Sequence, residues 1–469
     1  MTPKDNKRSK FSPVFSSLVA ARDDYIPGVD GLRGLSVLAV ILFHLDVQVL
    51  GGGYLGVDVF FVISGYLITG IVLRQLQDGN YSYGRFLAKR ALRLLPALAL
   101  VTFVTTVVAW VSFSPSQLSR FGDSVIGVAT YTSNFVFMLD RGYFEQTSAT
   151  TPLLHTWSLG VEEQFYLLFP LLLSFLFRWG TRRIFWGGVI LTSISLLIWL
   201  YLRESDFTQT IFQSFGEWAF FFFPLRAWEL GLGALLALVY RQIQISIRGV
   251  TVREILAWFG IVVLLLSFEI GSASPDRGVP ALLAVVAAIL IISFHKGTLL
   301  GRFLSSPVLA GLGLMSYGLY LWHFPIISFL KLYSGQEILG LHLKLLVLGL
   351  SLVLAYLSLH FVENPIRYSN LGSIGTLRLG IGFVVLFASL GISAKVPNWE
   401  YPVEARSADI LETNDWVYFE NMDEGRFQLE RLAGDLGYSP NTLVVGSSRV
   451  MQLDSTAWGT DVLNLAISG

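Results

Sequence analysis

The 469-residue chain has no cysteine and few charged residues, and each shortage excludes a kind of chemistry. Without cysteine it can form no disulfide, thiolate nucleophile or cysteine-ligated metal site. Only 14% of the residues are charged, against about 25% in soluble domains. The formal net charge is zero, so no basic excess indicates a nucleic-acid partner. By contrast, 53% of the residues are hydrophobic and the mean hydropathy is +0.61, which is typical of a protein with many membrane spans.

Long apolar runs predict an all-α polytopic membrane protein with eleven spans. The runs lie at about residues 31–45, 57–73, 92–111, 161–177, 184–202, 218–240, 255–270, 280–294, 307–330, 343–362 and 377–394. Residues 1–24 are polar and basic, and they lack the apolar core of a cleavable signal peptide. We therefore expect them to form an N-terminal tail.

The Lys and Arg residues outside the spans are distributed unequally between the two sides. Before residue 395, twenty lie in the tail or in loops on its side, and five lie in loops on the opposite side. By the positive-inside rule the N-terminus is cytoplasmic. An odd number of spans then places everything after residue 395 outside the membrane.

The region after residue 395 changes in character. Residues 396–440 are rich in acidic and polar residues and are predicted to form a linker. Residues 441–469 contain two strand-like runs and a tight turn at Gly446, Ser447 and Ser448. Because so short a segment rarely folds alone, we expect the chain to stop inside an α/β domain.

The first span carries two polar residues, Arg33 and His44, in an otherwise apolar run. They are 11 residues apart, which is about three helical turns and ~16 Å, so both lie on one face of the helix. A charge at mid-membrane depth costs roughly 2.5–3.5 kcal/mol on insertion scales, so such residues usually face a protein interior or a wet cavity. This face is the first candidate for a functional site.

Three further segments carry candidate polar groups. Arg90 and Arg93 share a helical face and have paired donors that could bind phosphate, although ordinary cytoplasmic anchoring explains them as well. Glu163 enters the apolar run of the fourth span, where an acid near a helix start is also favoured by the helix dipole. His323 precedes Pro325 within a span and could satisfy the carbonyl that this proline releases.

The region between the first two spans offers residues with simpler interpretations. Ser64 and Gly65 would permit close helix packing. Asp58 is expected near the end of the first span, where it could orient His44.

Five segments together resemble the acyltransferase-3 family of integral membrane proteins, which O-acylate cell-surface glycans. They are GVDGLRGLSVLAVILFH (28–44), GGGYLGVDVFFVISGYLIT (51–69), RFLAKRALRLLP (85–96), WSLGVEEQFY (157–166) and SYGLYLWHFP (316–325). The resemblance covers roughly residues 25–370 and implies a ten-helix acyltransferase domain. An eleventh span at 371–395 and an outer region resemble the subgroup that acetylates lipopolysaccharide O-antigen, in which an SGNH-type domain follows.

The resemblance implies an acyl-CoA donor, usually acetyl-CoA, that enters from the cytoplasm of a bacterium and meets a periplasmic or lipid-linked glycan at the inner membrane. It implies His44 as the catalytic base and Arg33, Arg90 and Arg93 as the residues that hold CoA. Glu163 would face the inner cavity, and no metal is expected. Ser448 falls on the SGNH nucleophile position, although Ser447 replaces the usual aspartate and the later SGNH blocks are absent.

Two questions stay open at the level of sequence. The acyl group could pass directly from CoA to the glycan, or through an acyl-enzyme at Ser448. A proton-coupled transporter or flippase would also have many spans with buried His, Arg and Glu, and a membrane anchor for an outer domain is a third alternative. The two halves of the chain show no matching pattern of broken spans, which speaks against a transporter.

Overall fold

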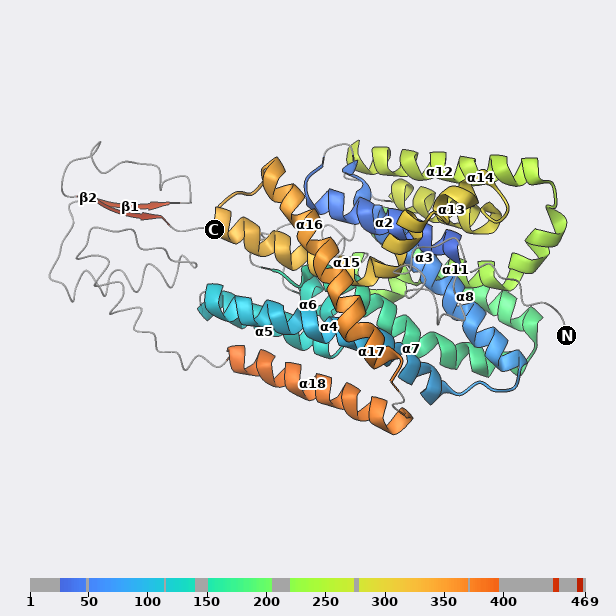
Figure 1. Ribbon diagram of the computed structural model, residues 1–469, viewed down its shortest axis with the longest axis horizontal. Helices are drawn as coiled ribbons and strands as arrows, with labels where there is room; N and C mark the ends of the chain where they lie inside the picture. Colours follow the sequence, from blue (N-terminus) through green and yellow to red (C-terminus); the bar gives the residue numbers. More distant parts are fainter. Residues whose placement is uncertain are drawn as a thin grey trace. The chain divides into compact units, whose positions relative to one another are not determined.

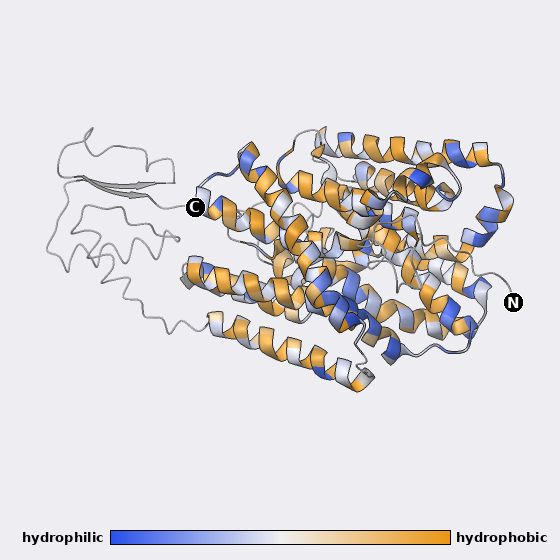
Figure 2. Ribbon diagram, viewed as in Figure 1, coloured by the Kyte–Doolittle hydropathy of each residue, from blue (hydrophilic) through white to orange (hydrophobic). Residues whose placement is uncertain are grey.

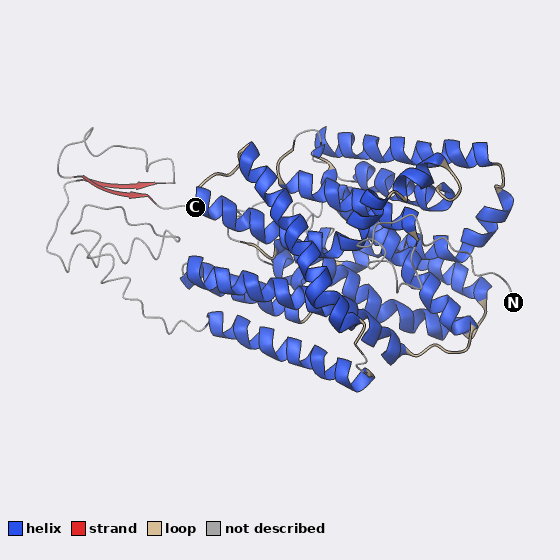
Figure 3. Ribbon diagram, viewed as in Figure 1, coloured by secondary structure: helices blue, strands red, loops and turns tan. Residues whose placement is uncertain are grey.

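The structure is a computed structural model that describes residues 26–47, 50–113, 115–139, 151–204, 220–273, 278–369, 372–395, 442–446 and 462–466. Every helix of the described residues lies before residue 396, and two strands follow (Figures 1 and 3). The helices are α2 (Pro27–His44), α3 (Gly56–Gln77), α4 (Tyr83–Ser112), α5 (Pro115–Ala129), α6 (Ser133–Leu139), α7 (Trp157–Phe177), α8 (Thr181–Glu204), α11 (Phe223–Ser246), α12 (Val250–Ala273), α13 (Gly278–Phe294), α14 (Leu299–Leu304), α15 (Pro307–Ser334), α16 (Leu341–Ser358), α17 (Asn364–Arg367) and α18 (Ser373–Lys395). Short 3₁₀ turns precede α3 and α7, and a π-helical turn at Leu359–Glu363 follows α16.

Each of the eleven predicted spans corresponds to a helix, which confirms the all-α polytopic class. Nine helices of the described chain are long and apolar enough to cross a membrane. The other two predicted spans are α13, which is apolar but has only 17 residues, and α15, which has 28 residues. Helix α15 carries Tyr, Trp and His residues among its apolar ones.

The helices divide into an inner and an outer group by burial. In α2, 61% of the most apolar window is buried, whereas in α8 and α18 only 22% is buried. The outer helices expose large apolar side chains such as Leu197, Phe259, Val353 and Val385. In Figure 2 most residues along α12, α16 and α18 have the colour of hydrophobic residues, with hydrophilic residues near the helix ends. So much exposed apolar surface fits a lipid environment.

The inner helices approach closely where one of them has a glycine. A Cβ atom on Gly313 of α15 would lie 1.8 Å from the carbonyl oxygen of Asp30 in α2. A Cβ atom on Gly65 of α3 would lie 1.9 Å from the carbonyl oxygen of Leu230 in α11. The predicted packing role of Gly65 is therefore confirmed. Small residues at such contacts let helix backbones come together in a membrane.

One feature was not predicted. The segment between the third and fourth predicted spans was expected to be loop, but it contains α5 and α6. As the predicted span at 307–330 requires, α15 continues through Pro325, and it ends at a left-handed cap at Gly335.

The strands β1 (Thr442–Gly446) and β2 (Val462–Ala466) form a parallel pair with Thr442 opposite Val462. They belong to a separate compact unit from the helical bundle and are described by themselves. The pair agrees with the two predicted strands. The predicted tail at 1–24, the linker at 396–440 and Ser448 lie outside the described residues.

Candidate functional site

Helix α2 places Arg33 near its start and His44 at its last residue. Pro27 occupies the first turn, where its missing N–H breaks no helical hydrogen bond. Asp30 lies one turn before Arg33, and its Oδ1 is 3.4 Å from Arg33 Nη1. The Arg33 side chain is 13% exposed, so this cation is held largely inside the protein.

Helix α4 contributes Arg90 and Arg93 from one face. The Arg90 guanidinium lies over the rings of Phe86 and Tyr166, 5.7 Å from each centroid. Cation–π contacts of this kind orient the guanidinium without neutralising its charge. Arg93 forms no ion pair with any carboxylate that the structure describes.

A hydrogen-bonded chain of three side chains joins α3 to α7. The Tyr166 hydroxyl donates to Ser64 Oγ at 3.1 Å, and Ser64 Oγ donates to Glu162 Oε1. Glu162, rather than the predicted Glu163, is the acid that faces this chain. Glu163 is half-buried on the same helix, next to Glu162.

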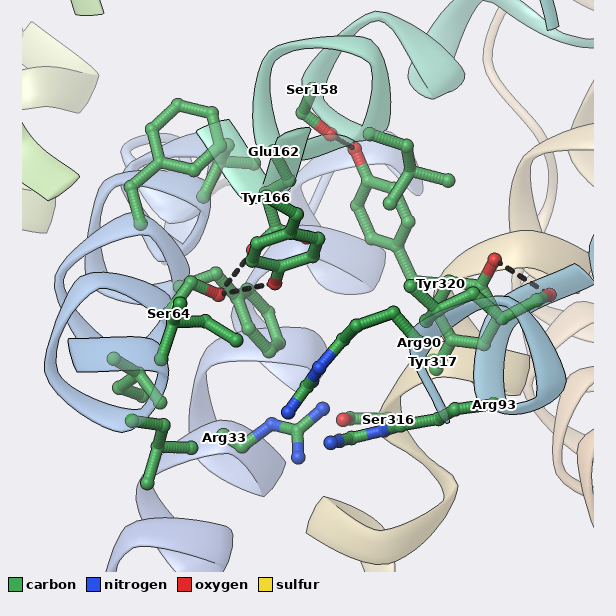
Figure 4. Close-up of a pocket in the computed structure, with 18 residues that line it drawn as sticks. Arg33, Ser64, Arg90, Arg93, Ser158, Glu162, Tyr166, Ser316, Tyr317 and Tyr320 are labelled. Carbon is green, nitrogen blue, oxygen red and sulfur yellow. Dashed lines mark hydrogen bonds between the residues drawn. The ribbon is translucent and has the colours of Figure 1, made fainter. Parts of the chain in front are cut away.

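These groups line one cavity of about 70 Å³ between α2, α3, α4, α7 and α15. In Figure 4 the guanidinium groups of Arg33, Arg90 and Arg93 point toward one another beside Ser316. Since a water molecule needs roughly 10–15 Å³ by this measure, the cavity has room for a few waters or one small anionic group. Its polar lining is formed by Arg33, Ser64, Arg90, Arg93, Ser158, Glu162, Tyr166, Ser316, Tyr317 and Tyr320.

The charge of this lining favours an anion. Three guanidinium groups face the cavity and only one carboxylate, Glu162, does so. The buried hydroxyl oxygen of Ser316, next to the arginines, has no hydrogen-bond partner among the described residues. Because a buried polar group without a partner is costly, this hydroxyl and the arginines are suited to an oxygen-rich ligand such as phosphate.

Tyr320 forms part of the cavity wall. Three histidines, His44, His155 and His323, cluster on its other side. His44 Nδ1 lies 3.1 Å from His323 Nε2. His155 stacks on Phe324 at 5.3 Å between centroids, and its ring lies 5.6 Å from that of His323. The Tyr320 hydroxyl hydrogen-bonds to the His155 carbonyl at 2.8 Å and to Ser158 Oγ at 2.7 Å. Tyr320 thus belongs both to the cavity and to the surroundings of the histidines.

His155 was not predicted as a site residue, because its position before the fourth span indicated a loop. It lies in a 3₁₀ turn and is 1% exposed. The three imidazoles do not form a metal centre: within the described part of the chain, no three His, Asp or Glu side chains could hold an ion together.

A buried ion network lies between α3 and α11. Arg226 Nη2 donates to Asp58 Oδ1 at 3.1 Å, and Arg226 Nε lies 3.3 Å from Glu229 Oε1. The guanidinium also lies over the rings of Phe61 and Trp157. Asp58 was expected near His44, but this network gives it Arg226 as a partner. The sequence analysis missed Arg226 and Glu229, although charges at i and i+3 inside an apolar run signal a buried site.

Of the six predicted site residues, the structure brings Arg33, Arg90 and Arg93 together at one cavity. His44 lies in the neighbouring histidine cluster on the same helix as Arg33, and Glu163 lies next to a residue of the cavity wall. Ser448 is outside the described residues.

Comparison with known proteins identifies the helical part of the chain. The model of an acyltransferase domain matches residues 26–360. A protein of Staphylococcus aureus (strain COL), provisionally named an O-acetyltransferase, is 35% identical over 358 residues, which cover 73% of this chain and 57% of that protein. The O-acetyltransferase OatA of S. aureus (strain NCTC 8325) is 34% identical over 356 residues, with the same coverage.

The chain therefore spans little more than half the length of these relatives. No solved structure matches it. The matched segment contains every residue of the cavity and of the histidine cluster. Because the domain match extends over most of the chain, this integral membrane protein belongs to the acyltransferase-3 family, as its sequence motifs predict.

Proposed function

We propose that this protein transfers an acyl group, most simply acetyl, from cytoplasmic acyl-CoA to a hydroxyl of a cell-surface glycan such as lipopolysaccharide O-antigen. The observation that carries the proposal is the convergence of Arg33, Arg90 and Arg93 on one cavity. The family and the names of the two relatives support O-acyl transfer as the reaction type.

The geometry supports an elongated donor with phosphates at one end. The guanidinium groups suit phosphate, because their paired N–H donors match its oxygens. His44 follows Arg33 by 11 residues on a single helix, about 16 Å along its axis. A donor that binds the arginines and reaches His44 must therefore carry its reactive group on a long arm. Acyl-CoA has this construction, with its thioester at the far end of the pantetheine arm.

In the proposed reaction His44 acts as a general base. It accepts the proton of the acceptor hydroxyl while the hydroxyl oxygen bonds to the thioester carbonyl carbon. The carbon–sulfur bond then breaks, and the proton on His44 passes to the departing CoA thiolate. The products are an O-acyl ester and free CoA, and the base returns to its neutral form.

Two features of the proposal depend on residues whose roles are inferred from the family resemblance. Glu163, which the resemblance assigned to the inner cavity, is proposed to act from beside the cavity, next to Glu162. Ser448 is proposed as an acyl carrier in the outer region, if transfer proceeds through an acyl-enzyme rather than directly.

The test is the O-acetyl content of surface polysaccharide in a bacterial host that lacks this modification. Wild type, His44→Ala and His342→Ala are compared at equal membrane levels; His342 is exposed and serves as the control. We expect acetylation with wild type and with His342→Ala and none with His44→Ala. Equal acetylation with His44→Ala would overturn the proposed base, and no dependence on acetyl-CoA in purified protein would favour a carrier instead.

A further inference from the structure

We propose that His323 is a positioning residue that fixes the tautomer of His44, so that the lone pair used for catalysis is on His44 Nε2. This inference rests on the proposed function, in which His44 is the base. It follows from two hydrogen bonds, His323 Nδ1 to the Leu319 carbonyl and His44 Nδ1 to His323 Nε2, and from the burial of the His323 ring.

The first step assigns the proton of His323. Its Nδ1 lies 3.2 Å from the carbonyl oxygen of Leu319, one turn earlier in α15. A carbonyl oxygen can only accept a hydrogen bond, so Nδ1 must carry the proton. Because donor and acceptor belong to the same helix, this contact does not depend on the substrate or on how neighbouring helices move.

The second step assigns the charge of His323. The side chain is fully buried, and none of the described carboxylates forms an ion pair with it. Its neighbours are the rings of Tyr320, Phe324, His155 and His44. Since an unpaired buried charge is very costly, the ring is neutral. A neutral ring with its proton on Nδ1 has its lone pair on Nε2.

The tautomer of His323 determines the tautomer of His44. His44 Nδ1 lies 3.1 Å from His323 Nε2, and one of the two nitrogens must donate. His323 Nε2 is the acceptor, so His44 Nδ1 is the donor, and the lone pair of neutral His44 is on Nε2. The edge-to-face contact of His44 with Phe324, at 4.9 Å between centroids, holds the ring in this orientation.

The same hydrogen bond assists the reaction after proton transfer. When His44 Nε2 accepts a proton, the ring becomes a cation and its Nδ1–H becomes a stronger donor to His323 Nε2. His323 thereby stabilises the charged intermediate without touching the substrate. A neutral imidazole fulfils this role without placing a negative charge in the membrane interior.

The direct test is ¹⁵N NMR of histidine-labelled protein in lipid nanodiscs. The chain has six histidines, so the His44 signals can be assigned by difference from His44→Gln. We expect a protonated Nδ1 and an unprotonated Nε2 in wild type, the same tautomer in His323→Gln, whose amide oxygen can still accept, and a mixture of tautomers in His323→Leu. A wild-type His44 that is protonated on Nε2 would overturn the inference. This readout needs no turnover, so it stands even if the proposed acyl transfer fails.

The second test is kinetic. It asks whether a hydrogen-bond acceptor at position 323, rather than the packing of the ring, is what the reaction requires. For His323→Leu we expect kcat to fall about 100-fold with little change in KM for acetyl-CoA, because only the base is affected. The kcat of His323→Gln should be at least about tenfold higher than that of His323→Leu. The control, His342→Gln, alters an exposed residue and should behave as wild type. Equal losses in the Leu and Gln variants would show that His323 serves only for packing.

Discussion

Arg93 carries a full charge into a cavity that already contains the guanidinium groups of Arg33 and Arg90. Like charges so close together repel one another, and no described carboxylate pairs with Arg93. An anionic ligand would relieve this repulsion, so the arginine cluster favours an anion before any particular donor is considered. Of the three, Arg93 is the most informative to change, because its loss breaks no ion pair within the described structure.

We predict that Arg93→Ala raises KM for acetyl-CoA about 10–100-fold, since a charged hydrogen bond contributes roughly 1.5–3 kcal/mol. Arg93→Lys should recover only part of this, because an ammonium group lacks the paired donors of a guanidinium. Steady-state kinetics of purified protein give both values. Arg178→Ala removes an exposed charge and is the control. An unchanged KM in Arg93→Ala would show that this arginine does not contact the donor.

Glu162 and Glu163 are adjacent, but only Glu162 lines the cavity and accepts the hydrogen bond of Ser64. We predict that Glu162→Gln lowers kcat about tenfold or more, because a neutral amide accepts more weakly than a carboxylate from Ser64. Glu163→Gln should have the smaller effect. The two variants are a matched pair, identical in the substitution and adjacent in the same helix, and are compared by acetyl transfer at saturating acetyl-CoA. The reverse order would make Glu163 the functional acid.

At this scale, the residues that could be predicted from sequence were those that stand out within their own segment. Arg33 was identified because a charge in an apolar run is unusual, and Arg90 and Arg93 were identified because they share one helical face. The partners of Ser64 could not be identified, because Glu162 is 98 residues away in the chain and Tyr166 is 102. The same holds for His44 and His323, which are 279 residues apart. Only the packing of helices brings such pairs together.

Among the elements, α3 and α11 are joined by a glycine contact and by the buried network of Asp58, Arg226 and Glu229. The side chains of the three network residues are at most 5% exposed. A complete buried ion network adds little to the free energy of unfolding compared with apolar residues of similar volume. Removing one member, however, leaves a buried charge without a partner. The network therefore specifies how these two helices pair rather than adding much stability.

We predict that Arg226→Met lowers the free energy of unfolding by about 3–5 kcal/mol, because two buried carboxylates lose their cation. The triple variant Asp58→Asn, Arg226→Met, Glu229→Gln should recover most of this, since it leaves no buried charge. Thermal unfolding in detergent measures both. Lys331→Met is the control: its partner Asp46 is 45% exposed, and such a pair contributes less than about 1 kcal/mol. A triple variant as unstable as Arg226→Met would contradict this account.

Helices were predicted correctly where contact with lipid requires a long apolar segment. Apolar runs located a helix at each of the eleven predicted spans, because a helix that crosses a membrane must be predominantly apolar over about 20 residues. Helices α5 and α6 were missed because they are shorter and carry polar residues, so their helical character depends on the bundle. His155 was missed for a related reason, since its 3₁₀ turn is buried by packing against other helices, among them α15 and α6.

At the scale of the whole molecule, three of the helices that line the cavity, α2, α3 and α15, bury most of their residues inside the bundle. Helices α2, α3 and α15 contribute both to the cavity and to the glycine contacts, whereas α8, α12, α16 and α18 present apolar side chains outward. The arginines enter from segments that the charge distribution assigns to the cytoplasm. A donor from that side would then reach His44 by passing along α2, which makes the orientation of the chain a requirement of the proposed function.

The absence of cysteine allows this orientation to be tested directly, because each introduced thiol is the only one in the chain. Asn80 and Glu337 are both exposed, in the α3–α4 and α15–α16 loops respectively. By the positive-inside rule we predict that, in cells with a permeable outer envelope and an intact inner membrane, a membrane-impermeant maleimide labels Glu337→Cys but not Asn80→Cys. Permeabilising the inner membrane should expose Asn80→Cys, and the wild-type chain should stay unlabelled throughout. Labelling of Asn80→Cys with the inner membrane intact would place the arginine cluster on the side without acyl-CoA, and the proposed donor would then have no route to the site.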